Sequence, residues 1–176
     1  MKKIILVSIC LMIFSCKKEN TSANSVLSVG QNYGGGIIFY IDGTGEHGLI
    51  AATSDQSDSV QWYNGTYITT NTFEGEVGKG KPNTNAIVNV QGNGIYAASL
   101  CDQLVLNGFS DWFLPSKSEL NLLYQKRNLV GGFANDYYWS SPEYDTLKAW
   151  NQYFPFGVQY YADKSSMAHV RAIRAF

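Results

Sequence analysis

Five carboxylates in the second half of the chain are the residues best suited to chemistry: Asp111, Glu119, Asp136, Glu143 and Asp145. Two carboxyl groups held at a fixed separation across a glycosidic bond would form the catalytic pair of a glycoside hydrolase. Distance along the chain does not encode that separation in space. We therefore expect no catalytic residues and keep a glycan-active enzyme as the lesser alternative.

The histidines and the cysteine of the predicted domain show no metal-binding or catalytic spacing. His47 lies beside a turn glycine and His169 begins the expected last strand, and neither has Cys, Asp or Glu at the spacing of a metal site. Cys101 lies on an apolar helical stripe without the partner that would activate a catalytic thiolate. We expect structural roles for all three residues, with neither a metal nor a cofactor.

Two polar motifs point to structure rather than catalysis. The spacing Ser116-x-x-Glu119 predicts a capping box, in which each side chain satisfies a backbone amide at the start of a helix. Arg171 and Arg174 are three residues apart, so a regular strand points them to opposite faces and at least one enters the protein. A buried guanidinium needs a carboxylate partner. We predict an ion pair with Asp111 or Glu143 that locks the last strand.

The elements that must position these residues begin with strands. A run of β-branched and aromatic residues follows Gly34, and a second apolar run ends at Ala52. Glycines separate the two runs, and this pattern predicts a β-hairpin. A phosphate-binding loop would need a helix directly after its glycines, which this segment lacks. Asn64-Gly65 suits a type I′ turn and predicts a second hairpin over residues 61–67.

Three helices are expected in the middle of the chain. Asn83 or Thr84 is the expected cap of a short helix that ends at Gly92. Apolar residues at helical spacing from Ala97 to Leu104 predict a second helix that stops at Gly108. A third helix should run from the capping box to residues 126–127, and strands and loops should follow it to the end of the chain.

The N-terminus has the outline of a lipoprotein signal. Two lysines precede an apolar run over residues 4–14, and Ile13-Phe14-Ser15-Cys16 resembles a bacterial lipobox, in which the chain is cut before a cysteine that is then acylated. The apolar run is too short to span a bilayer as a helix, which takes roughly 20 residues. We therefore predict a signal peptide over 1–15, a lipidated Cys16 with a flexible tether over 16–28, and one domain over 29–176.

The predicted mature chain carries 11 basic and 14 acidic residues, since Lys2 and Lys3 leave with the signal. The net charge of the predicted mature chain is therefore negative, so it lacks the positive surface potential that binds nucleic acid. The expected partners are therefore the membrane, through the N-terminal lipid, and a ligand outside the cell.

A set of ordered motifs spans the predicted domain. These motifs are Asn83-Thr84-Asn85-Ala86-Ile87, Tyr96-Ala97-Ala98, the run Gly108 to Pro115, Glu119 to Tyr124, Tyr138-Trp139-Ser140-Ser141, Ala149-Trp150 and Val170-Arg171-Ala172-Ile173-Arg174. Together they resemble the Lcl C-terminal domain family and are similar to the Fibrobacter major paralogous domains. The resemblance covers residues 29–176.

The resemblance implies an α+β, C-type-lectin-like fold. Such a fold has short antiparallel strands, two or three helices, and N- and C-terminal strands that come together. Relatives occur on bacterial surface proteins, adhesins included, so the resemblance implies binding rather than catalysis. The residues to which we assign structural roles are Asp111, Trp112, Ser116, Glu119, Trp139, Glu143, Trp150, Arg171 and Arg174.

Two departures from related sequences affect function. Ala172 stands where some relatives have a cysteine, which favours a reduced and buried Cys101. Lys81-Pro82-Asn83 and Trp150-Asn151-Gln152 replace the motifs with which calcium-dependent lectins hold their metal. A lysine cannot ligate calcium and glutamine offers only a neutral oxygen, so calcium-mediated sugar binding is not expected.

The segment after Ala149 is where we expect a ligand. Alternation along a strand places Trp150, Gln152 and Phe154 on one face, expected to meet the core. Asn151 and Tyr153 lie on the other face and are expected to be exposed. The loop-rich stretch that follows resembles the variable region of lectin-like proteins diversified by retroelements. The predicted ligand-binding residues are Tyr144, Asn151, Tyr153, Phe156, Tyr160, Tyr161 and Asp163. The alternative is that these aromatic side chains pack on one another.

Together these features predict a noncatalytic lectin-like domain for glycan or protein ligands. The lipid would hold it at the outer membrane or cell surface. The alternative is a structural or assembly component of the envelope that has no small ligand.

Overall fold

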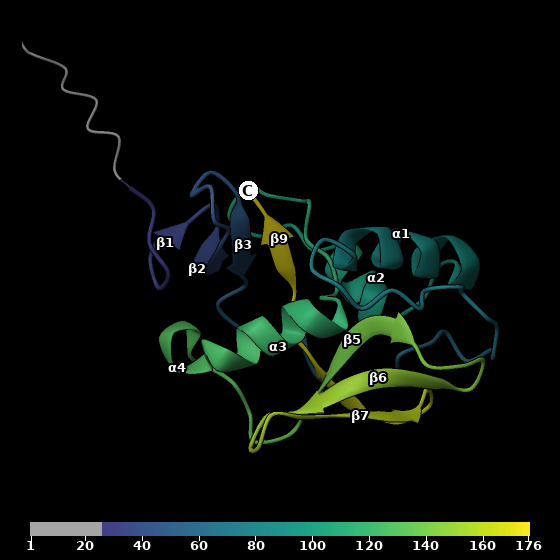
Figure 1. Cartoon of the computed structure of the whole chain (residues 1–176). Coiled ribbons are helices and arrows are strands. Elements are labelled where there is room, and N and C mark those ends of the chain that lie inside the picture. Colours follow the sequence, from purple (N-terminus) through teal and green to yellow (C-terminus); the bar gives the residue numbers. More distant parts are fainter. Residues whose placement is uncertain (1–25) are drawn as a thin grey trace, which may run out of the picture.

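Two β-sheets and four helices make up residues 26–176, the part of the chain that the computed structural model describes (Figure 1). The predicted α+β class is confirmed, with four helices in this part rather than two or three. The predicted signal peptide and Cys16 lie outside the described residues. None of the helices in the described part has the length and apolar character needed to cross a bilayer.

The first sheet joins both ends of the domain. Its strands are β1 (Asn32–Tyr33), β2 (Gly36–Ile41), β3 (Gly48–Ala51) and β9 (Ile173–Ala175), all antiparallel in the order β1-β2-β3-β9. The predicted first hairpin is thus β2-β3. The last strand lies beside β3 with Arg174 opposite Ile50, so strands from both ends of the domain share one sheet, with β1 and β9 at its two edges (Figure 1).

The second sheet carries the candidate site. Its strands are β4 (Ser57–Val60), β5 (Tyr137–Glu143), β6 (Lys148–Tyr153), β7 (Val158–Asp163) and β8 (Ala168–Val170), in the order β4-β8-β5-β6-β7. Strands β5, β6 and β7 form an antiparallel meander, and β8 pairs with β5 in parallel. The aromatic and β-branched residues of the meander favour strand conformation.

The helices differ from their predicted bounds. They are α1 (Gly80–Gln91), α2 (Ala97–Asp102), α3 (Lys117–Gln125) and α4 (Arg127–Val130). Asn83 and Thr84 lie inside α1 instead of capping it, because their side chains bond elsewhere: Asn83 Nδ2 donates to the Glu74 carbonyl, and Thr84 Oγ1 accepts from the Leu114 amide. The predicted end at Gly92 is confirmed.

Helix α2 is shorter than predicted and ends before Leu104. Gly108 instead belongs to a separate turn, in which Leu106 and Phe109 exchange backbone hydrogen bonds of 3.0 Å. The capping box of α3 forms as predicted. Glu119 N donates to Ser116 Oγ at 3.2 Å, and Ser116 N donates to Glu119 Oε2 at 2.7 Å.

The predicted second hairpin is wrong. A type I′ turn needs positive φ at both central residues, but of the pair only Gly65 has it, at 86°. Asn64 Nδ2 donates to the carbonyls of Gln91 and Asn93, and Trp62 is fully buried. The segment therefore lies against the end of α1 instead of folding back on itself.

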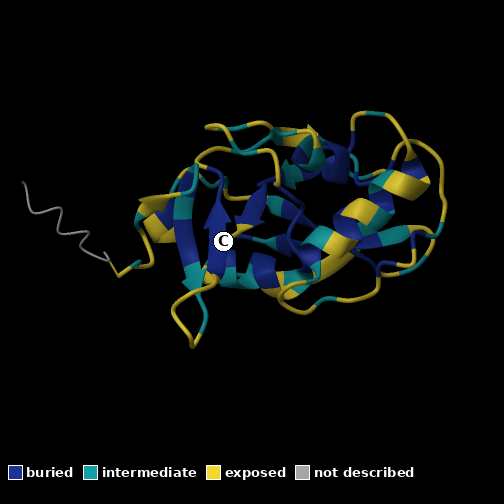
Figure 2. Cartoon of the chain, turned by 90° about the horizontal axis from the view of Figure 1, so that it is seen from above, coloured by how far each residue is buried: buried dark blue, intermediate teal, exposed yellow. Residues whose placement is uncertain are grey.

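Tryptophans form the centre of the core. Buried residues occupy the strands and the inward sides of the helices (Figure 2). The indoles of Trp62, Trp112 and Trp139 are fully buried, and each N–H donates to a backbone carbonyl at 2.9–3.1 Å. Each core indole thus loses its water contacts without leaving a donor unpaired.

Cys101 is a buried free thiol in this core, as predicted. Burial raises the pKa of the thiol far above its usual range, and only the thiolate reacts rapidly. In a chain carrying Cys10→Ser and Cys16→Ser, we expect a coloured aromatic disulfide reagent to modify Cys101 at neutral pH only as fast as the protein unfolds. Stopped-flow absorbance with and without denaturant measures this. Rapid modification of the folded protein would show that the thiol is accessible.

Candidate functional site

The predicted ligand-binding residues lie on two opposite faces of the β5-β6-β7 meander. Residues directly opposite one another in a ladder share a face. Asn151 pairs with Tyr160, whereas Trp150 pairs with Tyr161. We call the first side the tyrosine face, defined by Tyr137, Asn151, Tyr153 and Tyr160. The second is the helix face, because α3 packs on it.

On the helix face, α3 covers the three residues that we expected to meet the core. Gln152 Nε2 donates to Asn121 Oδ1 of α3 at 2.9 Å, and Phe154 packs edge-on against Tyr124 at 5.5 Å between ring centroids. Gln152 and Phe154 are buried as expected. Trp150 stays partly exposed, with Lys117 Nζ 3.3 Å from its ring centroid. Burial beside this ring lowers the pKa of Lys117.

Tyr144 and Tyr161 pack on this same face. Their rings stack at 4.0 Å with an interplanar angle of 11°, and each meets Trp150 edge-on at 5.6 Å. For these two residues the self-packing alternative describes the structure. Asp163 accepts hydrogen bonds from Ser165 Oγ and Tyr67 Oη, both at 2.6 Å, which lower the pKa of its carboxyl. Asp163 therefore holds the turn after β7.

On the tyrosine face, the prediction that Asn151 is exposed is wrong, since the residue is 5% exposed. The residue lies in the middle strand between Trp139 of β5 and Tyr160 of β7. Large rings on both sides cover it. Tyr153 is half-buried for a similar reason, because its ring lies 4.6 Å from that of Tyr137.

A hollow of about 330 Å³ opens on this face above Asn151. It is lined by Tyr137, Asn151, Tyr160, Tyr161, Ala162, Ser166 and Met167. The Oδ1 atom of Asn151 is buried and has no hydrogen-bond partner among the described residues. An unpaired buried acceptor costs about 1–3 kcal/mol, so a ligand that supplied a donor would remove that cost.

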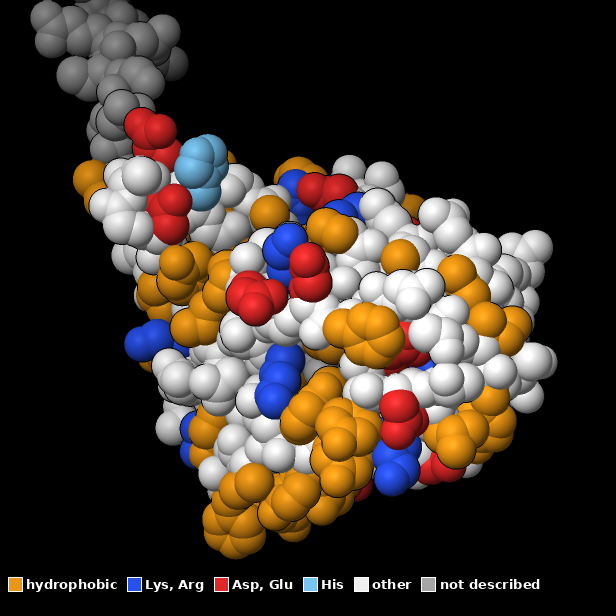
Figure 3. Space-filling view, turned by 45° about the vertical axis from the view of Figure 1, so that its right-hand side comes forward, with side chains coloured by type: hydrophobic (Ala, Val, Ile, Leu, Met, Phe, Trp, Pro, Cys, Tyr) orange, Lys and Arg blue, Asp and Glu red, His pale blue; other side chains and the backbone are white. Residues whose placement is uncertain are grey.

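Exposed aromatic side chains continue from the hollow along the meander. Tyr137 meets Tyr160 edge-on at 6.2 Å, and Tyr153 lies 5.8 Å from Phe156 in the β6-β7 turn. Phe156 is 77% exposed and Tyr160 is 47% exposed. Figure 3 shows hydrophobic side chains gathering along the lower edge of the molecule, where Figure 1 places β6 and β7.

The two closing arginines are both buried and paired. Arg174 forms the predicted bond with Asp111, through Nε at 2.7 Å and Nη2 at 2.9 Å, which lowers the pKa of the Asp111 carboxyl. The partner of Arg171 is Asp55, at 2.6 Å from Nε, a residue that the sequence did not single out. No recognisable motif surrounds Asp55, so only the fold could have shown it.

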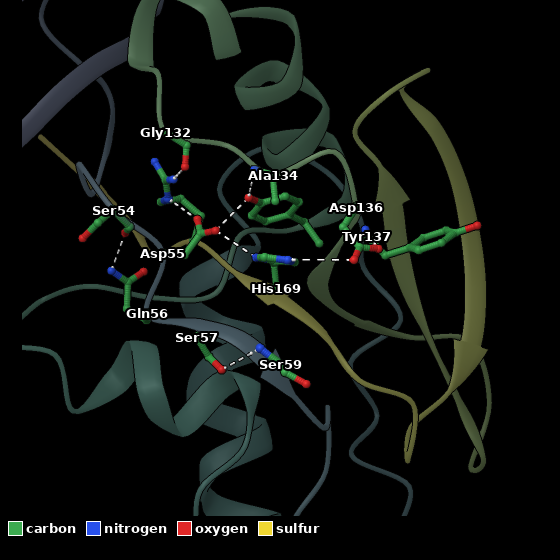
Figure 4. A network of polar contacts seen from close by, with 12 residues as sticks. Ser54, Asp55, Gln56, Ser57, Ser59, Gly132, Ala134, Asp136, Tyr137 and His169 are labelled. Carbon is green, nitrogen blue, oxygen red and sulfur yellow. Dashed lines mark hydrogen bonds and ion pairs between the residues drawn. The ribbon is translucent and has the colours of Figure 1, made fainter.

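Asp55 is the centre of a polar network (Figure 4). Besides Arg171, its carboxylate accepts from Tyr138 Oη at 2.7 Å and lies 3.0 Å from His169 Nδ1. On the other side, His169 Nε2 lies 4.0 Å from Asp136. Burial raises the pKa of the Tyr138 hydroxyl. These contacts join the segment after β3 to β5, to β8 and to the residues between β8 and β9. The network therefore fixes the junction of the two sheets.

Glu143, the other carboxylate that we considered for the arginines, binds Lys164 instead. Lys164 Nζ lies 2.7 Å from Glu143 Oε2, and both side chains are fully buried. The same carboxylate accepts from the backbone amides of Thr70 and Asn71. In residues 26–176, no cluster of three or more His, Cys, Asp or Glu side chains could hold a metal ion.

Comparison with known proteins gives a family match and similarity to solved structures. A sequence profile described as the Lcl C-terminal domain matches residues 51–174. The crystal structure of a fimbrial protein from Bacteroides ovatus is similar over 72% of this chain, with 13% sequence identity and a TM-score of 0.49. That match covers 35% of the fimbrial protein, so this chain spans about a third of its length. No curated protein matches the chain significantly.

Proposed function

The chain belongs to the Lcl C-terminal domain family, and from this premise we propose a membrane-anchored envelope lipoprotein with a noncatalytic, lectin-like ligand-binding domain. The lipobox at Ile13–Cys16 and the polar tether after it support the anchor. The pairing of β9 with β3, which joins the two ends of the domain, supports a C-type-lectin-like fold. The proposed ligand is a glycan or a protein outside the cell.

The tyrosine face is the observation that carries the binding proposal. It presents a continuous strip of half-buried and exposed aromatic rings beside a hollow whose buried amide oxygen lacks a partner. Tyrosine offers a large contact area at a small entropic cost, and asparagine offers adaptable hydrogen bonds. Exposed apolar patches of this kind mark binding surfaces. Tyr144 and Tyr161, which stack on the helix face, and Asp163, which holds the turn after β7, are assigned supporting roles.

A glycan and protein array tests the proposal. The full chain, purified in a detergent without a sugar headgroup, is expected to bind a subset of ligands. Tyr153→Ala with Tyr160→Ala should weaken that binding at least about tenfold, because aromatic anchors carry most of the energy of such interfaces. Tyr33→Ala is the matched control, since Tyr33 is 43% exposed but lies in the other sheet.

Two results would count against the proposal. If the variant with both Tyr153→Ala and Tyr160→Ala bound its ligands as tightly as the native chain, the binding site would not be on the tyrosine face. A folded chain that binds nothing on the array would favour a structural or assembly role in the envelope.

A further inference from the structure

We infer that the hollow above Asn151 binds a single uncharged sugar ring, with a sugar hydroxyl hydrogen-bonded to the side-chain amide of Asn151. This inference rests on the proposed function and narrows its ligand to a neutral saccharide. It is carried by three properties of the hollow: the unpaired acceptor, the aromatic wall and the absence of charge from the lining.

The unpaired acceptor requires a donor. Asn151 is 95% buried and lines the hollow, and its Oδ1 is closed off from solvent and has no partner among the described residues. A half-turn of the amide about χ2 exchanges its oxygen and nitrogen, so it can present Oδ1 to a ligand in the hollow. Buried polar atoms are nearly always hydrogen-bonded, so an exception at a cavity points to a missing group. A hydroxyl is a suitable donor because it rotates to suit the acceptor and can accept a bond in return. Ser166 adds a second polar group to the lining.

The aromatic wall suits the other side of a sugar ring. Tyr137 and Tyr160 meet at an interplanar angle of 65°, so their rings form a corner beside Asn151. The face of an aromatic ring carries partial negative charge and attracts positively polarised hydrogens. A pyranose has C–H groups on one face and hydroxyls around its edge. Such a ring can lie against Tyr160 while one hydroxyl reaches the amide.

The lining argues against charged ligands. Neither Lys, Arg, His, Asp nor Glu is among the residues that line the hollow. A carboxylate, sulfate or ammonium group placed there would lose water without gaining a counterion, which is costly. The volume of about 330 Å³ is at the lower end of the range for ligand pockets. It therefore suits one ring, with the rest of a longer glycan outside.

Calorimetric titration of the full chain with methyl glycosides tests the inference. The probes are neutral methyl hexopyranosides and their uronic acid and amino sugar counterparts, in a detergent without a sugar headgroup. We expect the neutral glycosides alone to bind. Asn151→Leu should weaken binding about tenfold or more, since it removes the acceptor and leaves a similar shape. The same change should leave the thermal midpoint of unfolding unchanged or raised, because the unpaired polar atom is gone.

Two further variants keep the test decisive. Asn128→Leu, at an exposed position of α4 that does not line this hollow, should leave glycoside binding unchanged. If Asn151→Leu fails to fold, Tyr160→Ala replaces it, since this ring is half exposed and its loss should weaken binding similarly. The inference is overturned if neutral glycosides do not bind, if charged ones bind better, or if the variants bind them as well as the native chain.

The array separates failure of this inference from failure of the proposed function. Suppose that array ligands bind and lose affinity in the Tyr153→Ala and Tyr160→Ala variant, but that no methyl glycoside binds. The tyrosine face would then be a binding surface for proteins or other glycans, and only the sugar site would be disproved. An array without ligands would remove both.

Discussion

Lys164→Met is expected to lower the free energy of unfolding by about 3–5 kcal/mol. Lys164 and Glu143 are both fully buried and lie 2.7 Å apart. Methionine has a similar length but no charge, so the substitution would leave the Glu143 carboxylate buried with only backbone amides as partners. Urea unfolding followed by tryptophan fluorescence measures the change, because the Lys164 ammonium lies 4.7 Å from the ring centroid of Trp62.

A second substitution tests the reason for that loss. Adding Glu143→Gln to Lys164→Met should recover part of the stability, since glutamine is neutral and can still accept from the amides of Thr70 and Asn71. The matched control is Lys79→Met, whose ion pair with Glu74 is 41% and 62% exposed. Exposed pairs contribute about 0–1 kcal/mol. Equal effects of Lys164→Met and Lys79→Met would show that the buried pair has no special importance.

Local sequence patterns predicted those parts of the fold that depend on neighbouring residues. The capping box at Ser116 and Glu119 formed as predicted because both partners lie in one helical turn. The hairpin β2-β3 likewise follows from an apolar run, a turn and a second run. Asn64-Gly65 was a misleading turn signal, because hydrogen bonds to the end of α1 decide the conformation of that segment.

Partners that are far apart in the sequence were predicted only in part. The pairing of Arg174 with Asp111 was among the predicted possibilities, whereas Asp55 and Lys164 were missed. A lysine in a polar segment is usually exposed, and nothing near Lys164 in the sequence shows that it is buried. The fold alone brings it to Glu143.

In the candidate site, too, the local pattern was predicted from the sequence and the contacts between distant residues were not. Alternation correctly grouped Trp150, Gln152 and Phe154 on one face of β6, because side chains alternate in any strand. It could not show which side chains pack on either face. Helix α3 packs on one face, and Trp139 and Tyr160 of the neighbouring strands flank Asn151 on the other. The cover over Asn151 is what turns an ordinary surface asparagine into a buried, unpaired acceptor.

Arg171→Met is the other substitution expected to destabilise the fold strongly, by about 3–5 kcal/mol. The guanidinium donates to Asp55 Oδ1 at 2.6 Å and to the carbonyls of Ala52 and Gly132 at 3.1 and 2.5 Å. It also lies 4.1 Å from the ring centroid of Phe133. Methionine would keep the apolar contact but leave the buried acceptors without their donor. Chemical denaturation gives the change in the free energy of unfolding.

Comparison with other substitutions shows which property of Arg171 matters. Arg171→Lys should recover only a part of the loss, because an ammonium cannot reproduce the planar fork that reaches several acceptors at once. Arg174→Met should cost less than Arg171→Met, since the side chain of its partner Asp111 is 52% exposed and can be solvated when the arginine is gone. If Arg171→Lys were as stable as the native chain, charge alone would explain the role of Arg171. If Arg174→Met lowered the free energy of unfolding more than Arg171→Met did, the ion pair with Asp111 would be the more important contact of the last strand.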